Sequence, residues 1–339
     1  MDAKITKTRL SRMLSYDWLK IVISAVVAIV VWSLIFTMTA TRITPAQQFS
    51  VMNYLGSAPF ATTKFNELYN NAFNEKVFSY EVLEVNQNDL AANREYASTL
   101  LEARMATEEG DVIFVADTDN PDTEIKDGEN VTYEFTYLES LILRNRANMY
   151  ELDPAKEGSF FHKMEAYLDT FYDGGWESGT LNEEKVEVQF RARVKKDKRF
   201  KKEKQIAKGV QDDIARIQKY RDALDQFYIW IEDGTLAFTT TVFSDREEKK
   251  DVYYPADGIY SINLCPNEKM KGLEKYVGYY KEVIDEETGK THHTITAENM
   301  NVAFFYFPGV EDGFQYESLL FVNYLVENVL GQTQAGGQK

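Results

Sequence analysis

The chain has 339 residues, of which 44% are hydrophobic and 27% are charged, and its formal net charge is −16 at pH 7. This composition is typical of a folded protein with a sizeable core and excludes an intrinsically disordered chain. The charge is unevenly distributed, because residues 1–20 carry five basic and two acidic side chains, a net of +3, which leaves −19 for the remainder. An acidic domain of this kind repels nucleic acid, so no nucleic-acid partner is expected.

Residues 21–41 predict a helix that crosses a membrane. Positions 21–40 contain no charge, Gly or Pro, and twenty helical residues span about 30 Å, the thickness of the hydrocarbon core of a bilayer. Because the basic side chains precede this stretch, the positive-inside rule predicts a single-pass protein of the cell membrane, with residues 1–20 cytoplasmic and the main domain extracytoplasmic. A cleaved signal peptide is the alternative, although its apolar region is usually only about 7–15 residues long.

The segment after the apolar stretch is expected to alternate strands and helices. The patterns predict strands at 48–57, 77–85 and 111–117 and helices at 62–76 and from Asp89 to Gly110. The third strand has five consecutive apolar residues bounded by Asp111 and Asp117, which is typical of a strand buried on both faces of a parallel sheet. This order of elements predicts a βαβαβ unit.

The middle of the chain is expected to be mainly helical, and strands return near its end. Helices are predicted at 133–152, 159–172, 183–232, near 267–280 and at 314–330, strands at 235–243, 257–265 and 300–308, and a turn at 285–290. Residues 186–194 alternate as in a strand, but their charged, Lys-rich surroundings favour a helix. The predicted fold class is therefore α/β with a helix-rich middle insertion.

A basic run stands out in this acidic chain. Residues 193–204, RVKKDKRFKKEK, carry eight basic side chains and two acidic ones. Such a run could contact an anionic partner, a cell-wall polymer or lipid headgroups. The more common use, the solvated face of a long helix balanced by nearby carboxylates, is the favoured interpretation.

No signature of catalysis, metal binding or cofactor binding is found in the sequence. The chain has no GxSxG, P-loop or GxGxxG motif. Its histidines, His162, His292 and His293, lack the spacing of a metal site, and the carboxylate-rich segment 117–130 lacks the glycine of a calcium loop. We therefore expect neither an enzyme nor a bound metal or cofactor.

The segment STLLEARMATEEGDVIFVAD at 98–117 resembles the type II extracellular solute-binding proteins of bacterial ABC transporters, and residues 251–265 are similar to the point where such chains return from their second lobe. The resemblance implies a two-lobed α/β domain after the membrane helix. The implied parts are a first lobe at 42–118 and 251–331, a helix-rich second lobe at 119–250, and a disordered tail at 332–339. The family usually carries a lipid-anchored cysteine or no anchor, whereas this chain has an apolar helix.

The resemblance also implies where a ligand would bind. In open α/β sheets the cleft lies beyond the carboxyl ends of the parallel strands, which points to Gly56, Ser57, Asp117, Thr118 and Tyr260. The implied function is non-covalent binding of a small molecule or peptide by closure of two lobes. The alternative is a cell-envelope interaction protein or a structural subunit of a membrane complex, which would bind a membrane-protein partner and no small ligand.

Overall fold

The computed structural model describes residues 7–39, 47–53, 63–90, 96–127, 130–246, 254–285, 289–306 and 315–336. The chain divides into two compact units, Met1–Thr44 and Pro45–Lys339. Among the described residues, the first unit holds one helix, and the second holds the strands and the other helices.

The first unit contains the expected apolar helix. Helix α1 covers Lys7–Thr39, and its stretch Trp18–Phe36 is long and apolar enough to cross a membrane. The side chains of this stretch are exposed, so the helix is not the buried core helix of a soluble domain. A helix of this kind serves as a membrane anchor or as a signal sequence.

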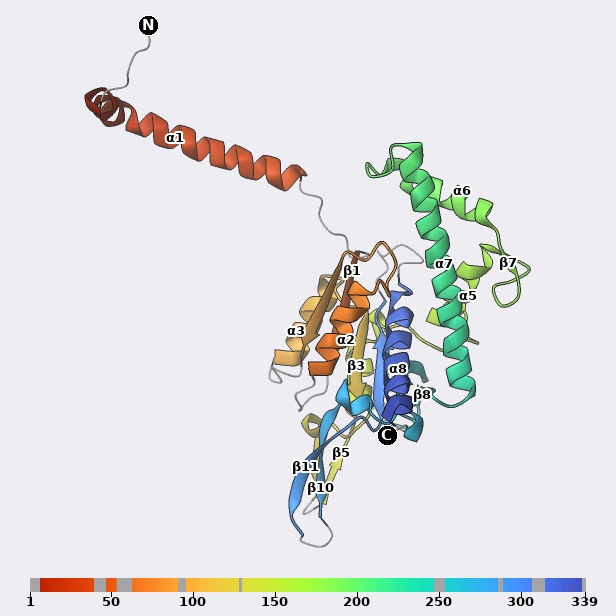
Figure 1. Ribbon diagram of the computed structural model, residues 1–339. Coiled ribbons are helices and arrows are strands. Elements are labelled where there is room, and N and C mark those ends of the chain that lie inside the picture. The colour runs from red at the N-terminus through yellow and green to blue at the C-terminus, as the bar shows by residue number, and fades with distance from the viewer. Residues whose placement is uncertain are drawn as a thin grey trace. The chain divides into compact units, whose positions relative to one another are not determined.

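The second unit is built on a mixed six-stranded sheet (Figure 1). In spatial order the strands are β2 (Glu84–Asp89), β1 (Gln48–Asn53), β3 (Val112–Ala116), β12 (Met300–Phe304), β9 (Gly258–Asn263) and β8 (Ala237–Thr241). Strand β1 is parallel to both β2 and β3, as the βαβαβ pattern predicts. The returning half is antiparallel, since β12 runs opposite to β3 and β9, and β9 runs opposite to β8.

Two hydrophobic cores lie on the two faces of this sheet, because successive side chains of a strand point in opposite directions. Val112, Phe114 and Ala116 of β3 belong to the larger core, whereas Ile113 and Val115 belong to the smaller one. The larger core includes residues of α2 (Thr63–Asn74) and α8 (Glu317–Gly336), and the smaller one includes residues of α3 (Ala97–Ala106) and α4 (Tyr137–Asn145). Helices therefore cover both faces.

The helix-rich middle packs on the larger core. Its helices are α5 (Phe160–Asp169), α6 (Glu183–Arg193) and α7 (Glu203–Glu232). The segment 186–194, whose sequence alternates as in a strand, is therefore helical, as expected. The rings of Phe161 and Phe227 stack with centroids 4.7 Å apart, and the side-chain amide of Asn323 in α8 donates to the carbonyl of Ala223 in α7 at 2.8 Å. Strand β8, which falls within the expected second lobe, is paired into the main sheet.

Small elements complete the unit. The antiparallel pairs are β4 (Glu124–Asp127) with β5 (Asn130–Tyr133), β6 (Tyr172–Asp173) with β7 (Thr180–Leu181), and β10 (Tyr279–Ile284) with β11 (Thr291–Thr296). Short 3-10 helices cover Pro121–Thr123, Arg146–Asn148, Val194–Lys196, Glu268–Met270 and Leu273–Lys275. Of the predicted turn at 285–290, residues 286–288 lie outside the described residues. At its ends the Asp285 amide donates to the carbonyl of Lys290 at 3.0 Å, and the Gly289 amide donates to the carbonyl of Asp285 at 2.8 Å.

Several elements differ from the sequence expectation. The helix predicted near 267–280 is instead the 3-10 turns Glu268–Met270 and Leu273–Lys275 and the start of β10, and Asp89, expected to begin a helix, is the last residue of β2. The predicted strand 77–85 is irregular as far as Leu83, because Phe78 and Val82 are buried as loop residues, and the polar segment Glu84–Asp89 forms the strand instead. The first residues of the predicted helix 133–152 lie in and after β5, and the α-helix ends at Asn145. Helix α8 extends to Gly336, into the segment expected to be a disordered tail.

Candidate functional site

The structure describes three of the five residues that the sequence placed at one cleft, namely Asp117, Thr118 and Tyr260. Gly56 and Ser57 lie outside the described residues. Asp117 and Thr118 follow the carboxyl end of β3, as expected, and Asp117 lines a cavity there. Tyr260 is only 1% exposed in the smaller core, where its hydroxyl accepts from Arg146 Nε at 2.9 Å and donates to a backbone carbonyl at 3.0 Å. Tyr260 is thus a core residue, and Asp117 is the predicted residue that reaches the cavity.

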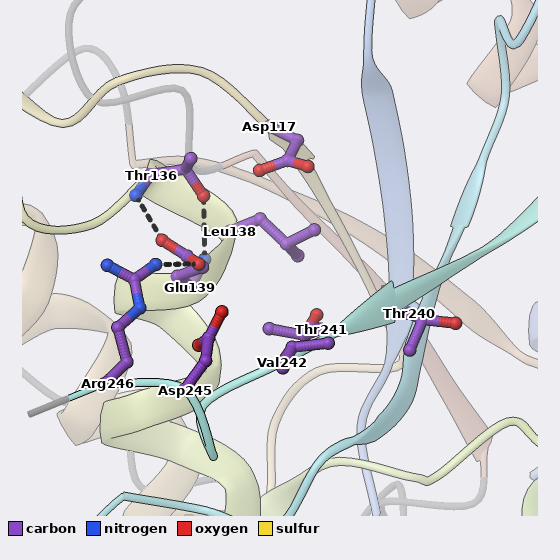
Figure 2. Close-up of a pocket in the computed structure, with 9 residues that line it drawn as sticks. All are labelled: Asp117, Thr136, Leu138, Glu139, Thr240, Thr241, Val242, Asp245 and Arg246. Atoms are coloured by element: carbon purple, nitrogen blue, oxygen red, sulfur yellow. Dashed lines mark hydrogen bonds and ion pairs between the residues drawn. The ribbon is translucent and has the colours of Figure 1, made fainter.

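The cavity has a volume of about 420 Å³. It lies between the end of β3, the first turn of α4 and the segment that follows β8 (Figure 2). Its lining residues are Asp117, Thr136, Leu138, Glu139, Thr240, Thr241, Val242, Asp245 and Arg246. Of the other predicted cleft residues that the structure describes, neither Thr118 nor Tyr260 belongs to this lining.

A helix cap positions two of the polar side chains. Thr136 precedes α4, its hydroxyl accepts from the Glu139 amide at 3.1 Å, and its own amide donates to the Glu139 carboxylate at 2.8 Å. This is a capping box, which the Thr-x-x-Glu spacing at 136–139 encodes locally. The Tyr137 amide donates to the carbonyl of Thr118 at 2.9 Å, which connects the end of β3 to the start of α4.

Arg246 lines one side of the cavity, and its guanidinium is paired with a carboxylate of the protein. Its guanidinium forms an ion pair with Glu139, donates to the carbonyl of Glu134, and lies 5.3 Å from the ring centroid of Phe135. The segment just before Arg246 is held by Asp257, whose carboxylate accepts a hydrogen bond from the Phe243 amide at 2.7 Å. Arg246 therefore neutralises Glu139 and fixes one wall.

The remaining carboxylates give the cavity a negative character. Burial raises the pKa of Asp117, and the nearby charge of Glu139 raises it further, while the hydrogen bond from Thr136 opposes the shift. Asp245 makes no hydrogen bond or ion pair with any residue that the structure describes. Three carboxylates and one guanidinium line the cavity, which leaves an excess of negative charge.

A buried hydroxyl without a partner lies in the same wall. Thr241 is 5% exposed, and within the described part of the chain its Oγ1 has no hydrogen-bond partner. Leaving a buried polar group unsatisfied costs roughly 1–3 kcal/mol, so a native structure rarely does so without a reason. A ligand that donates a hydrogen bond to Thr241 would remove this cost.

The arrangement is suited to binding a positively charged, hydrogen-bond-donating molecule. Carboxylate and hydroxyl oxygens accept hydrogen bonds from an ammonium or guanidinium group. Across the described ranges, no three His, Cys, Asp or Glu side chains are gathered in a way that could hold a metal ion. The acceptor oxygens of the lining fit an organic cation that donates several hydrogen bonds.

Comparison of the chain with protein-family models, with curated proteins and with solved structures finds no match. The resemblance to solute-binding proteins accordingly stays a prediction. Sequence reasoning located Asp117 from the end of its strand and missed the other polar residues of the cavity. The Thr-x-x-Glu spacing could have revealed Thr136 and Glu139, whereas the residues at 240–246 are brought there only by pairing of the sheet.

Proposed function

We propose that this chain is a membrane-tethered protein whose extracytoplasmic domain binds a small organic cation non-covalently in the cavity at the carboxyl end of β3. The observation that supports it most is the combination of two carboxylates without a cationic partner in the described residues, Asp117 and Asp245, with the buried, unpartnered hydroxyl of Thr241. The position of the cavity agrees with the general rule for ligand sites in open α/β sheets.

In this proposal the ligand carries an ammonium group that donates hydrogen bonds to Asp117, Asp245 and Thr241. Desolvation of the paired charges on binding makes each such bond stronger than it would be in water. Binding would also release protons, because a cation next to Asp117 favours its charged form and so lowers the pKa that burial raises.

The test is a thermal-shift titration of the full chain in a neutral detergent. The probes are 1,4-diaminobutane, spermidine, choline, arginine, glucose, a neutral tripeptide and calcium. A ligand at a hundred times its Kd adds about 2.7 kcal/mol of stability, and we expect a shift with amines and not with glucose. The affinity should fall as the pH is lowered, because protonation of Asp117 removes a negative charge from the site.

Matched variants identify the site. We expect Asp117→Asn and Asp245→Asn each to weaken amine binding about tenfold, the size of one charge-assisted hydrogen bond. Asp119→Asn is the control, since Asp119 is exposed, lies two residues from Asp117 and does not line the cavity. Equal effects of Asp117→Asn and Asp119→Asn would contradict the site, and no shift with any probe would contradict solute binding itself.

The alternative of a protein-binding subunit is favoured by one other feature. The β10–β11 hairpin exposes Tyr280 (46%), Ile284 (66%) and Ile295 (47%) on one face, since Tyr280 pairs with Ile295 and Ile284 is four residues further along the same strand. Exposed apolar surface of this kind often marks a contact with another protein. If the thermal shifts fail, this face is the surface on which cross-linking to membrane partners should concentrate.

A further inference from the structure

A second cavity, of about 650 Å³, lies between α7 and the segment that joins α2 to β2. It does not share a lining residue with the first cavity. Its lining residues are Phe73, Asn74, Lys76, Phe78, Ser79, Tyr80, Val82, Lys208, Asp212, Ala215, Arg216 and Lys219. Four of these are basic and one is acidic, the reverse of the charge balance of the whole chain.

One wall of this second cavity is apolar and fixed. Phe78 and Val82 are 4% and 7% exposed, and Phe78 packs on Phe321 of α8 with ring centroids 6.2 Å apart. Phe73, at the end of α2, is 41% exposed beside them. This wall offers a surface to a hydrocarbon chain, and each CH₂ group buried on it would add to affinity.

The rim of this cavity is formed by Lys76, Lys208 and Lys219, and two of these lysines can bind an external anion. The Lys219 ammonium donates to the carbonyl of Lys76 at 2.5 Å, and burial lowers its pKa. Lys76 and Lys208 are exposed, and neither ammonium has an ion-pair partner within the ranges that the structure describes. The rim therefore presents cations to the mouth of an apolar cavity.

The wall beneath the rim does not compete for the ligand. Arg216 is 2% exposed, forms an ion pair with Asp213 at 2.9 Å and donates to the Tyr167 hydroxyl at 2.8 Å. Tyr80 donates to the same Asp213 carboxylate at 3.2 Å. Asp213 is shared with Arg193, which lies 3.0 Å from the same oxygen, so Arg216 is held by partners inside the protein. The exposed lysines are the groups that can meet an external anion.

The cavity is continuous with the basic run at 193–204. Arg193 donates to the Tyr80 hydroxyl at 2.8 Å, and Arg199 lies 3.6 Å from the carboxylate of Glu81, so the run contacts the segment that lines the cavity. Within α7, residues spaced by three or four share one face. Lys204 and Lys208 are four residues apart, and Asp212 and Ala215 continue this face of α7 as far as Lys219.

We propose that this cavity binds an amphipathic anion, a lipid with an acyl chain and a phosphate headgroup. The acyl chain lies on Phe73, Phe78 and Val82, and the headgroup lies between Lys76 and Lys208, next to the basic run. Apolar burial and attraction to lysines act together here, as at other sites that recognise anionic lipids. The proposal is independent of the function assigned to the first cavity, because it involves different residues and the opposite ligand charge.

The experiment uses the full chain in a neutral maltoside detergent and native mass spectrometry. Dihexanoyl phosphatidylglycerol, dihexanoyl phosphatidylcholine and inorganic phosphate are titrated separately at equal concentrations. We expect the anionic lipid to bind about tenfold more tightly than the zwitterionic one, given the contribution of each lysine near an anionic headgroup. Inorganic phosphate should bind more weakly than the anionic lipid, because it lacks the chain.

Three variants locate the site. Lys76→Gln combined with Lys208→Gln should weaken binding of the anionic lipid about tenfold. Ala215→Trp, on an exposed position of α7 that lines the cavity, should reduce binding by filling the space that the acyl chain needs. Lys185→Gln combined with Lys281→Gln is the charge-matched control, since both lysines are exposed, pair with Asp173 and Glu298 respectively, and lie outside the cavity.

Each outcome decides the proposal. Loss with the rim pair and with Ala215→Trp, but not with the control pair, supports it. Equal loss with both lysine pairs means that only net charge matters and overturns it. If phosphate and the anionic lipid bind equally well, the site binds anions and does not use the acyl chain, which overturns the proposal. If the two lipids bind equally well, the site does not select for charge, which overturns it as well.

Discussion

Two carboxyl groups, those of the partly buried Asp111 and the buried Glu317, interact electrostatically where β1, β3 and α8 come together. Asp111 accepts a hydrogen bond from the Ser50 amide at 2.7 Å, and burial raises its pKa to about 7, helped by the nearby charge of Glu317. Glu317 accepts from the Tyr220 hydroxyl at 2.5 Å and from the Ser79 amide at 3.0 Å, yet burial still raises its pKa above the ordinary value. The protonated form of Asp111 is therefore the one that the fold favours.

This arrangement predicts how the free energy of unfolding depends on pH. In the unfolded chain Asp111 loses its proton near pH 3.9, whereas in the folded chain it keeps the proton up to about pH 7. Between these values the folded state binds the extra proton, so the contribution of Asp111 to stability falls as the pH rises. We expect Asp111→Asn to remove this part of the slope in urea unfolding measured from pH 4.5 to 7.

The control for this measurement is Asp119→Asn, because Asp119 is exposed. That variant should keep the slope of the wild type. Other groups titrate in the same pH range, so the free energy of unfolding of Asp111→Asn is compared with that of the wild type at each pH. A difference that does not change with pH would show that Asp111 titrates like an ordinary carboxyl group.

Helices α6 and α7 pack closely at a glycine within α7. A Cβ on Gly209 would overlap the ring of Phe190 and lie 2.7 Å from Cε1 of Phe200. Phe190 is fully buried and its ring packs edge-on against Phe200 with centroids 5.1 Å apart, so the rings have little room to move. The glycine is therefore required by packing, although glycine weakens a helix interior by about 1 kcal/mol relative to alanine.

Substitution at this glycine separates helix propensity from packing. Gly209→Ala gains up to about 1 kcal/mol of helix propensity, but overpacking costs about 1–3 kcal/mol, so we expect a net loss of stability in urea unfolding. Gly331→Ala in α8 is the matched comparison, because a Cβ there would meet nothing within 4 Å. It should stabilise the protein, and a stabilising Gly209→Ala would contradict the close packing of α6 on α7.

Elements with a strong apolar pattern were predictable, and elements with a polar sequence were not. The apolar runs at 111–117 and 300–308 contain β3 and β12, whose residues are all buried. The sequence EVNQND of β2 has little apolar character, and it is a strand because it pairs with β1 along its whole length. The apolar residues before it pack as a loop. The sequence therefore placed the strand at 77–85, several residues before its position at Glu84–Asp89.

The candidate site was predictable only where it depends on local sequence. Asp117 follows a buried strand directly, and this position is enough to expect it at the end of the sheet. Thr241 and Asp245 reach the same cavity through the pairing of β8 with β9 and of β9 with β12. No local pattern specifies a contact between segments more than a hundred residues apart, because it is decided by the order of strands.

At the scale of the whole molecule, residues 45–339 form one compact unit. The sheet joins β1, near the start of this unit, with β8, β9 and β12 from its second half. Because these strands share hydrogen bonds and buried faces, we expect one cooperative unfolding transition rather than two. Thermal unfolding of the full chain followed by far-ultraviolet and near-ultraviolet circular dichroism should give coincident curves.

Separated transitions would instead indicate that the helix-rich middle, residues 119–250, unfolds as an independent lobe. The apolar helix α1 should not add a transition when the chain is in detergent, because its exposed side chains make it a separate unit. The variant Asn323→Ala removes the hydrogen bond from α8 to the carbonyl of Ala223 in α7. Its unfolding curves test whether the helix-rich middle and the sheet unfold together. Coupling predicts that both spectroscopic curves shift together.

The position of β12 in the centre of the sheet has a consequence for biosynthesis. Phe304 pairs with Val112, so the edge of β3 that faces away from β1 has no native partner until synthesis has passed residue 304. The apolar helix leaves the ribosome before β3, and β12 leaves it long after β3. During this interval β3 is an open, fully apolar edge of the kind that pairs with other chains. The nascent protein therefore has its greatest need of a chaperone just before residue 304 emerges.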